Sequence, residues 1–240
     1  MICVQGLCKA YRDVVAVDDL SFEFEAGSII GLVGPNGAGK TTTMRAVAGI
    51  IPATRGRMLV AGSDVIGDPI ETKRRVAYVA DDPKLFDALT VWEHLDFVHS
   101  VYQVEDWSAK ADNLLEQFEL TEKRDTPTHE LSRGMRQKVA ICCAYLYDPQ
   151  VLLFDEPLTG LDPRAIRTMK DSVAERAEAG ATLMVSSHLL GLVEDLCSHL
   201  LLLHQGKSLF CGTLRDALDQ FVDQDCESTL EDVFFRATES

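Results

Sequence analysis

The spacing of hydrophobic positions divides the chain into strand-like and helix-like stretches. Short apolar runs predict two groups of strands, at Ile2–Val4, Leu20–Phe24, Ser28–Val33, Met58–Val60 and Val76–Ala80, and at Val151–Phe154, Thr182–Ser186 and Leu200–Leu203. The runs VLLF and TLMVS show no polar alternation, which is typical of parallel strands covered on both faces. Helices are predicted from Gly39 to about Ile50 and from Pro163 to Ala179. This alternation of strands and helices indicates an α/β core with right-handed crossovers.

A different pattern fills the region between the two groups of strands. From Thr90 to Tyr147 the apolar positions follow helical spacing, on faces made of Val91, Leu95, Phe97, Val98 and Val101, of Leu114, Leu115 and Phe118, and of Val139, Ile141 and Ala144. We therefore expect a helical insert. The predicted units are a core of residues 1–82 and 149–204, a helical subdomain of residues 83–148, and a tail of residues 205–240. In the tail, KSLFCG predicts a hairpin strand and STLEDVFF a short helix.

The composition is that of an ordinary globular protein, and it narrows the classes of partner. The 240 residues are 46% hydrophobic and 25% charged, which is enough for a sizeable core. The formal net charge of −15 argues against nucleic acid as a partner, because phosphate backbones are bound by basic surfaces. No apolar run approaches the roughly 20 residues of a membrane-spanning helix. The first residues lack a secretory signal, so we expect a cytosolic protein.

The cysteines indicate neither a disulfide framework nor a metal site. Their number, seven, is odd, and their spacing does not match that of metal ligands. We therefore expect reduced thiols within the core, as in a reducing compartment.

One glycine-rich stretch has the composition of a phosphate-binding loop. The strand SIIGLVG runs directly into GPNGAGKTT, which opens a helix, and this order matches GxxxxGK[ST] in its required context. Glycines let backbone N–H groups approach an anion, and the N-terminus of the following helix adds partial positive charge. Lys40 is expected to reach the phosphates, and Thr41 to offer a hydroxyl ligand to Mg²⁺. The residues expected to contact the nucleotide here are Gly34, Pro35, Asn36, Gly37, Ala38, Gly39, Lys40, Thr41 and Thr42.

Two carboxylates follow a buried strand in VLLFDEP. They are expected at the carboxyl end of that strand, the edge of an α/β sheet where ligands bind. Beside a phosphate loop, Asp155 is expected to hold Mg²⁺ through its water shell. Glu156 is placed one residue further on, where it can accept a proton from an attacking water. The alternative for Glu156 is a structural ion pair at the end of the strand.

A third motif makes the pattern specific to one family. LSRGMRQK, at residues 131–138, lies between the phosphate loop and LLFDEP. Together these motifs resemble the ATP-binding cassette family, the nucleotide-binding subunits of ABC transporters, and the resemblance extends over nearly the whole chain. It implies a P-loop NTPase core with a RecA-like, mostly parallel sheet, a small antiparallel β part and an inserted α-helical subdomain. It also implies ATP and Mg²⁺ as cofactors.

The resemblance assigns roles to further residues. Those that it places at the nucleotide are Tyr11 against adenine, Ser132 and Gly134 of the signature across a dimer interface, Asp162 of the loop TGLDP, and His188 beside the γ-phosphate. The catalytic residues that it implies are Glu156, His188 and Lys40. Plain alternatives exist for four of these residues: Tyr11 as a surface aromatic, and Ser132, Asp162 and His188 as N-caps of the helices that follow them.

Two positions depart from the family pattern. Where the Q-loop normally offers glutamine after a strand such as YVP, Tyr78–Ala80 is followed by Asp81 and Asp82. An aspartate can bind a metal-bound water but cannot donate an amide hydrogen bond, so Asp81 is a candidate only for binding at the metal site. In the signature, Arg133 stands where glycine is usual and Met135 where glutamine is usual.

The resemblance also implies partners. Two cassettes, either two copies of this chain or close paralogues, pack head to tail around ATP, close when it binds and reopen after hydrolysis. Transport would need a separate transmembrane permease subunit, which would hold this chain on the cytoplasmic face of the membrane. The contact expected for that subunit is residues 82–94, where the apolar candidates are Leu85, Phe86 and Leu89. LSRGM and TLEDVFF resemble bacterial exporter cassettes. The alternatives are a soluble cassette ATPase of cofactor assembly and a nucleotide-gated module with little turnover.

Overall fold

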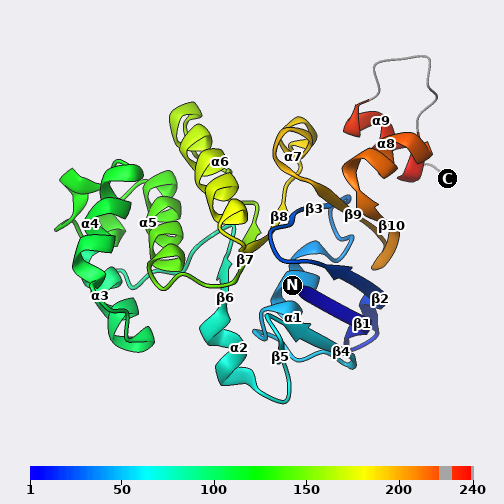
Figure 1. Cartoon of the computed structure of the whole chain (residues 1–240), viewed down its shortest axis with the longest axis horizontal. Coiled ribbons are helices and arrows are strands. Elements are labelled where there is room, and N and C mark those ends of the chain that lie inside the picture. The colour runs from blue at the N-terminus through cyan, green and yellow to red at the C-terminus, as the bar shows by residue number, and fades with distance from the viewer. Residues whose placement is uncertain (222–228, 239–240) are drawn as a thin grey trace.

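The strands form two sheets in the computed structural model, which describes residues 1–221 and 229–238 (Figure 1). The smaller sheet is antiparallel, with the strand order β2-β1-β4-β5. Its strands are β1 (Ile2–Tyr11), β2 (Val14–Phe24), β4 (Arg55–Val60) and β5 (Ser63–Asp64). β1 and β2 are longer than the hydrophobic pattern predicts, because register shifts between Val4 and Ala10 interrupt the regular alternation.

The larger sheet is mostly parallel and has the strand order β10-β9-β3-β8-β7-β6. Its strands are β3 (Ile29–Val33), β6 (Val76–Val79), β7 (Val151–Asp155), β8 (Thr182–Ser186), β9 (His199–His204) and β10 (Lys207–Thr213). Every neighbouring pair is parallel except β9 and β10. The carboxyl ends of β3, β7 and β8 therefore meet at one edge of the sheet. This arrangement confirms the predicted α/β class, with its mostly parallel sheet and small antiparallel part.

Hydrophobic layers cover both faces of the larger sheet. On one face, Leu153 and Met184 pack with Met44 of α1 (Lys40–Val47) and with the small sheet. On the other face, Leu152 and Leu183 belong to a second buried group, which includes residues of α5 (Arg133–Leu146) and α6 (Pro163–Glu178). Because side chains alternate along a strand, Leu152 and Leu153 enter opposite layers. These strands lack polar alternation because both of their faces are covered, as predicted.

Helices α3 (Val91–Tyr102), α4 (Trp107–Gln117) and α5 gather at one end of the molecule (Figure 1). α3 begins with a capping box, in which Thr90 Oγ1 accepts from the Glu93 N–H and Glu93 accepts from the Thr90 N–H. Two 3₁₀ turns follow α4, at Thr121–Lys123 and Thr128–Glu130. One further helix, α2 (Pro69–Arg75), precedes β6 and is absent from the sequence prediction; Asp68 caps it.

The helices α8 (Leu214–Phe221) and α9 (Leu230–Thr238) lie at the opposite end, and α7 (Leu190–Leu196) lies nearer the middle (Figure 1). KSLFCG forms most of β10. The predicted helix STLEDVFF coincides with the first part of α9, although Ser228 lies outside the described residues. Within residues 1–221 and 229–238, no helix has the length and continuous apolar character needed to cross a bilayer.

The cysteines are free thiols in the part of the chain that the structure describes. Cys3, Cys8, Cys142 and Cys197 are buried, as predicted for core thiols. Cys211 is exposed on β10, so the prediction is wrong for this residue, because β10 is the edge strand of its sheet. Cys226 lies outside the described residues.

Candidate active site

A cavity of about 420 Å³ lies where the phosphate loop meets the carboxyl end of β7. Its lining combines backbone-rich loop residues with two carboxylates: Tyr11, Ala16, Asn36, Gly37, Ala38, Gly39, Lys40, Thr41, Thr42, Asp155 and Glu156. The structure therefore brings together, around one cavity, Tyr11 and residues that the sequence predicted separately from two motifs.

The loop between β3 and α1 has the backbone that the glycine pattern predicts. Gly39 precedes the first turn of α1 with φ 102°, and a Cβ there would lie 2.6 Å from the carbonyl oxygen of Ala16. A larger residue would therefore be excluded by both its conformation and its neighbour. Lys40 Nζ donates to the carbonyl oxygens of Gly34 at 2.6 Å and Pro35 at 3.3 Å. Burial lowers the pKa of Lys40, while Glu156 and Asp155 act in the opposite direction.

Asp155 is a buried carboxylate with only 3% of its surface exposed. Its Oδ1 accepts hydrogen bonds from Thr41 Oγ1 at 3.1 Å and from Ser186 Oγ at 2.8 Å. Its Oδ2 accepts one from Tyr78 Oη at 2.9 Å. Asp155 and Ser186 are paired in register at the ends of β7 and β8, which explains their contact. Carboxylate and hydroxyl oxygens are the hard ligands that Mg²⁺ takes, so Thr41 and Asp155 fit the predicted metal.

Glu156 follows Asp155 in a left-handed backbone conformation, with φ 51°. A non-glycine residue rarely adopts this conformation, and here the Glu156 N–H is held by the Oγ and carbonyl oxygen of Ser186. His188 Nδ1 lies 2.8 Å from Glu156 Oε2. The predicted base and the predicted γ-phosphate sensor are therefore in direct contact. The alternative that His188 caps the next helix is wrong, because α7 begins at Leu190 with Leu189 in the capping position.

Tyr11 lies at the rim of the cavity, at the end of β1. Its ring is 47% exposed, and Lys9 Nζ lies 4.8 Å from the centre of the ring. An exposed aromatic ring beside the phosphate loop is suited to stacking on a base.

The signature residues Ser132 and Gly134 are not part of the cavity lining. Ser132 Oγ accepts from the Met135 N–H and caps α5, and Asp162 likewise caps α6 by accepting from the Ala165 N–H. These two capping predictions are confirmed. Gly134 packs directly on the loop before α6, since a Cβ there would lie 2.6 Å from the Gly160 carbonyl oxygen.

The two departures from the family pattern form one ion pair. Arg133 Nη2 donates to Asp81 Oδ1 at 2.8 Å, and both side chains are about half exposed. Nearby, Gln137 Nε2 donates to the carbonyl oxygen of Ala80, so α5 is joined to the segment after β6 at two points. The structure thus gives the Asp81 carboxylate a cationic partner within the same chain.

The comparisons with known proteins agree with this geometry. A family model described as "ABC transporter" matches residues 17–159. The ABC-type transporter ATP-binding protein EcsA of Bacillus subtilis is 32% identical over 99% of this chain and 96% of its own length. This chain belongs to the ABC transporter family. The cassette is the ATP-binding subunit of such a transporter and an ATPase.

Two further likenesses place the cassette within the family. The SkfA peptide export ATP-binding protein SkfE of Bacillus subtilis is 35% identical over 85% of each chain. A solved structure titled "Structure of ATP binding subunit of ABC transporter" superposes with a TM-score of 0.93 at 30% identity, covering 99% of both chains. The P-loop NTPase fold predicted from the sequence is confirmed for the cassette.

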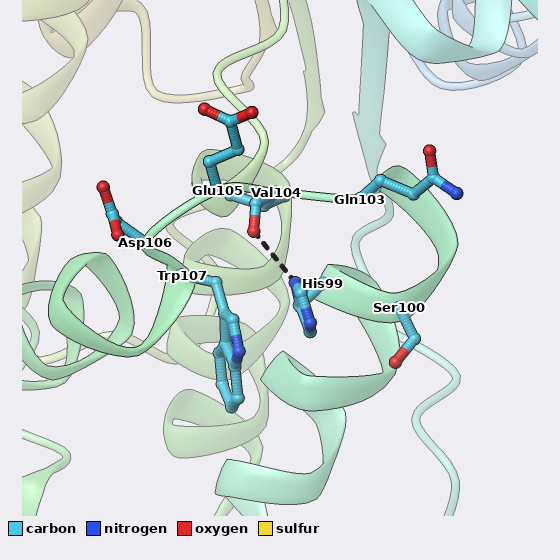
Figure 2. Close-up of a pocket in the computed structure, with 7 residues that line it drawn as sticks. All are labelled: His99, Ser100, Gln103, Val104, Glu105, Asp106 and Trp107. Atoms are coloured by element: carbon cyan, nitrogen blue, oxygen red, sulfur yellow. Dashed lines mark hydrogen bonds between the residues drawn. The ribbon is translucent and has the colours of Figure 1, made fainter.

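A second cavity, of about 580 Å³, lies between the end of α3 and the start of α4 (Figure 2). In it, His99 Nδ1 hydrogen-bonds to the carbonyl oxygen of Val104, and the His99 ring stacks on Trp107 with 5.0 Å between centroids. Its lining includes Glu105 and Asp106 and no lysine or arginine. The chemistry of this cavity is therefore unsuited to a polyphosphate, although its volume exceeds that of the cavity at the phosphate loop.

Two residues that connect to Asp155 from outside the cavity lining are given no role in the sequence analysis. Tyr78 and Arg45 reach Asp155 in series, since Arg45 Nε donates to Tyr78 Oη at 3.2 Å. The only local signal is a tyrosine in the buried strand VAYV, whose hydroxyl needs a polar partner. That signal does not identify the partner, because Tyr78 and Asp155 are 77 residues apart in the chain.

Proposed function

We propose that this chain is the ATPase subunit that drives a separate transmembrane permease, in an exporter. The observation that carries the catalytic part is the direct contact between Glu156 and His188 beside the phosphate loop. The export part is supported by the family and by the likeness to a protein whose name describes peptide export.

In the proposed mechanism the phosphate loop holds the ATP phosphates, and Lys40 turns from its own loop carbonyls toward the phosphate oxygens. Thr41 and Asp155 would hold Mg²⁺, which neutralises charge on the phosphates when it is bound. Glu156, which lines the cavity, accepts a proton from the attacking water. His188 orients Glu156 through their hydrogen bond and is proposed to contact the γ-phosphate.

Two cassettes are proposed to close head to tail around ATP, with Ser132 and Gly134 of one subunit facing the phosphate loop of the other. Two features support this. Ser132 caps the N-terminus of α5, so the N-terminal dipole of that helix can face an anion. Within the described residues, the signature lies outside the cavity of its own chain, as expected if it serves a partner's nucleotide. ATP that contacts both subunits would favour the closed dimer by the difference in affinity.

The permease is proposed to contact the helical end of the cassette, and this contact would place the chain on the cytoplasmic face of the membrane. Of the predicted apolar candidates, Phe86 is 56% exposed, whereas Leu85 and Leu89 are partly buried. Phe86 lies edge-to-face against Phe97, which is 48% exposed on α3. Adjacent exposed aromatic rings are typical of a protein-binding surface. Nucleotide binding by the core and permease contact by the helical end also support the proposed units. These are a nucleotide-binding core at 1–82 and 149–204, a helical subdomain at 83–148 and a tail at 205–240.

The decisive experiment is Glu156→Gln. This variant keeps the shape of the side chain but removes the base, so ATP hydrolysis should fall by at least about tenfold while ATP binding persists. Steady-state phosphate release and nucleotide binding would be measured on the same preparation, with and without the membrane subunit. Hydrolysis that falls less than this would show that Glu156 is not the base.

Three measurements separate the proposed function from its alternatives. A nucleotide-gated module would show negligible phosphate release from the unmodified chain, even with its partner. A soluble ATPase of cofactor assembly would purify without an integral membrane protein, whereas the proposed subunit should co-purify with one. A dimer that forms with ATP in the Glu156→Gln variant, detected by light scattering, would support the head-to-tail arrangement.

A further inference from the structure

Three hydroxyl groups converge on one buried carboxylate, and the proposed mechanism uses only one of them. Thr41 and Ser186 donate to Oδ1 of Asp155, and Tyr78 donates to Oδ2. Tyr78 lies on β6, opposite Leu153 of β7, so its side chain and that of Asp155 lie on the same face of the sheet. The tyrosine ring spans the diagonal between the two positions.

The direction of the hydrogen bond between Tyr78 and Asp155 is fixed by Arg45. A guanidinium can only donate, and Arg45 Nε donates to Tyr78 Oη at 3.2 Å. The single phenolic proton of Tyr78 is therefore free to point at Asp155. A carboxylate can only accept, so Tyr78 is the donor in this contact.

We infer that Tyr78, with Arg45 behind it, is a positioning residue that sets the orientation of Asp155 for Mg²⁺. This inference rests on the proposed function, in which Asp155 and Thr41 hold the metal. A carboxylate can rotate about its Cβ–Cγ bond, and a donor on each oxygen prevents that rotation. Tyr78 is the donor on Oδ2, whereas both other donors act on Oδ1. Partners that orient a metal-binding side chain typically change metal affinity by 10- to 100-fold.

The chain offers a matched control for removing this hydroxyl. Tyr147, like Tyr78, is partly buried, and its Oη donates to the carbonyl oxygen of Val76 at 3.0 Å, on the side of the helical insert. Tyr147→Phe removes the hydrogen bond to Val76, Tyr78→Phe removes those to Asp155 and Arg45, and both variants keep the ring. A general cost of losing such a bond would appear in both variants, whereas an effect on Mg²⁺ should appear only in Tyr78→Phe.

The experiment measures ATP binding to the whole chain by calorimetry, in EDTA and at a series of free Mg²⁺ concentrations. The Mg²⁺ midpoint is the Mg²⁺ concentration that gives half of the metal-dependent gain in ATP affinity. For Tyr78→Phe we expect this midpoint to rise by about tenfold. ATP affinity in EDTA should stay unchanged, because Tyr78 is not among the cavity-lining residues. Tyr147→Phe should match the unmodified chain in both measurements.

A second variant tests the chain of contacts. Arg45→Gln alters an exposed side chain and should shift the Mg²⁺ midpoint in the same direction but by less. If Arg45 acts through Tyr78, the double variant should shift it no further than Tyr78→Phe alone.

Three results would overturn the inference. One is a Mg²⁺ midpoint in Tyr78→Phe within twofold of the unmodified chain. Another is a loss of ATP affinity in EDTA as large as the loss with Mg²⁺, which would mean that Tyr78 has a general structural role. The third is additive shifts from the two variants, which would remove Arg45 from the inference. If ATP binding to the unmodified chain did not depend on Mg²⁺, the proposed metal site itself would fail, and that result is distinct from the other three.

Discussion

The close contact between the signature and the loop before α6 gives a prediction in which two opposing effects can be weighed. Gly134 is the second residue of α5, and an alanine in a helix is normally favoured over glycine by about 1 kcal/mol. Here, however, the added Cβ would lie 2.6 Å from the carbonyl oxygen of Gly160. That atom belongs to the backbone and cannot rotate away, so α5 or the loop must move. Inserting a group into such a packed contact typically costs about 1–3 kcal/mol.

We therefore expect Gly134→Ala to lower the free energy of unfolding by about 1 kcal/mol, because the steric cost exceeds the gain in helix propensity. Gly191 provides the control. It is also the second residue of its helix, α7, but a Cβ there would have no heavy atom within 4 Å. Gly191→Ala should leave stability unchanged or raise it by up to about 1 kcal/mol.

The assay is urea unfolding at equilibrium, followed by the fluorescence of Trp92 and Trp107. Both tryptophans lie in the helical end, with 4.8 Å between their ring centroids. At a slope of about 3 kcal/mol/M, the expected loss lowers the midpoint by about 0.3 M. A Gly134→Ala variant as stable as the unmodified chain, or more so, would refute the argument that the Gly160 carbonyl blocks this position. A loss of stability in both variants would refute it too, because the contact is present at only one of them.

The remaining predictions concern caps and charges. Thr90→Ala removes half of the capping box of α3 and should lower the free energy of unfolding by about 1 kcal/mol, as measured in urea. Hydrogen bonds with the Thr90 N–H and hydroxyl hold the pKa of Glu93 below its usual 4.5 in the folded chain. The stabilisation by Glu93 is therefore complete above pH 4.5 and is lost as the pH falls through the pKa of the folded chain. The stability of a Glu93→Gln variant should therefore approach that of the unmodified chain in acid; a constant difference would contradict this. Because burial lowers the pKa of Lys40 below its usual 10.5, ATP should raise this pKa again, so binding at a pH just below 10.5 should take up protons, which calorimetry in two buffers would detect. Arg133→Gln breaks the exposed ion pair with Asp81 and keeps a good helix-forming residue, so it should change stability by less than about 1 kcal/mol; a larger loss would show that the pair is shielded from solvent.

The predicted elements agree best with the structure where a motif is contiguous in the sequence. In GPNGAGKTT, a strand, a turn and a helix N-terminus follow one another directly, so a few backbone angles build the loop from its own residues. The caps at Ser132 and Asp162 are local in the same sense, because each binds an N–H three residues further on. The helix α2 and the full length of β1 escaped prediction, because short or irregular elements leave little periodic signal.

The sequence by itself determined the phosphate loop, the buried parallel strands and the order of the motifs, and these were enough to indicate the family. Only the tertiary structure decided which side chains meet. Tyr78 reaches Asp155 because β6 lies beside β7, and Arg133 meets Asp81 because the start of α5 is packed next to the end of β6. Hydrophobic periodicity records which face of an element is buried, but it does not record which element lies alongside. Contacts between residues far apart in the chain therefore follow from strand order and helix packing, which the local pattern leaves open.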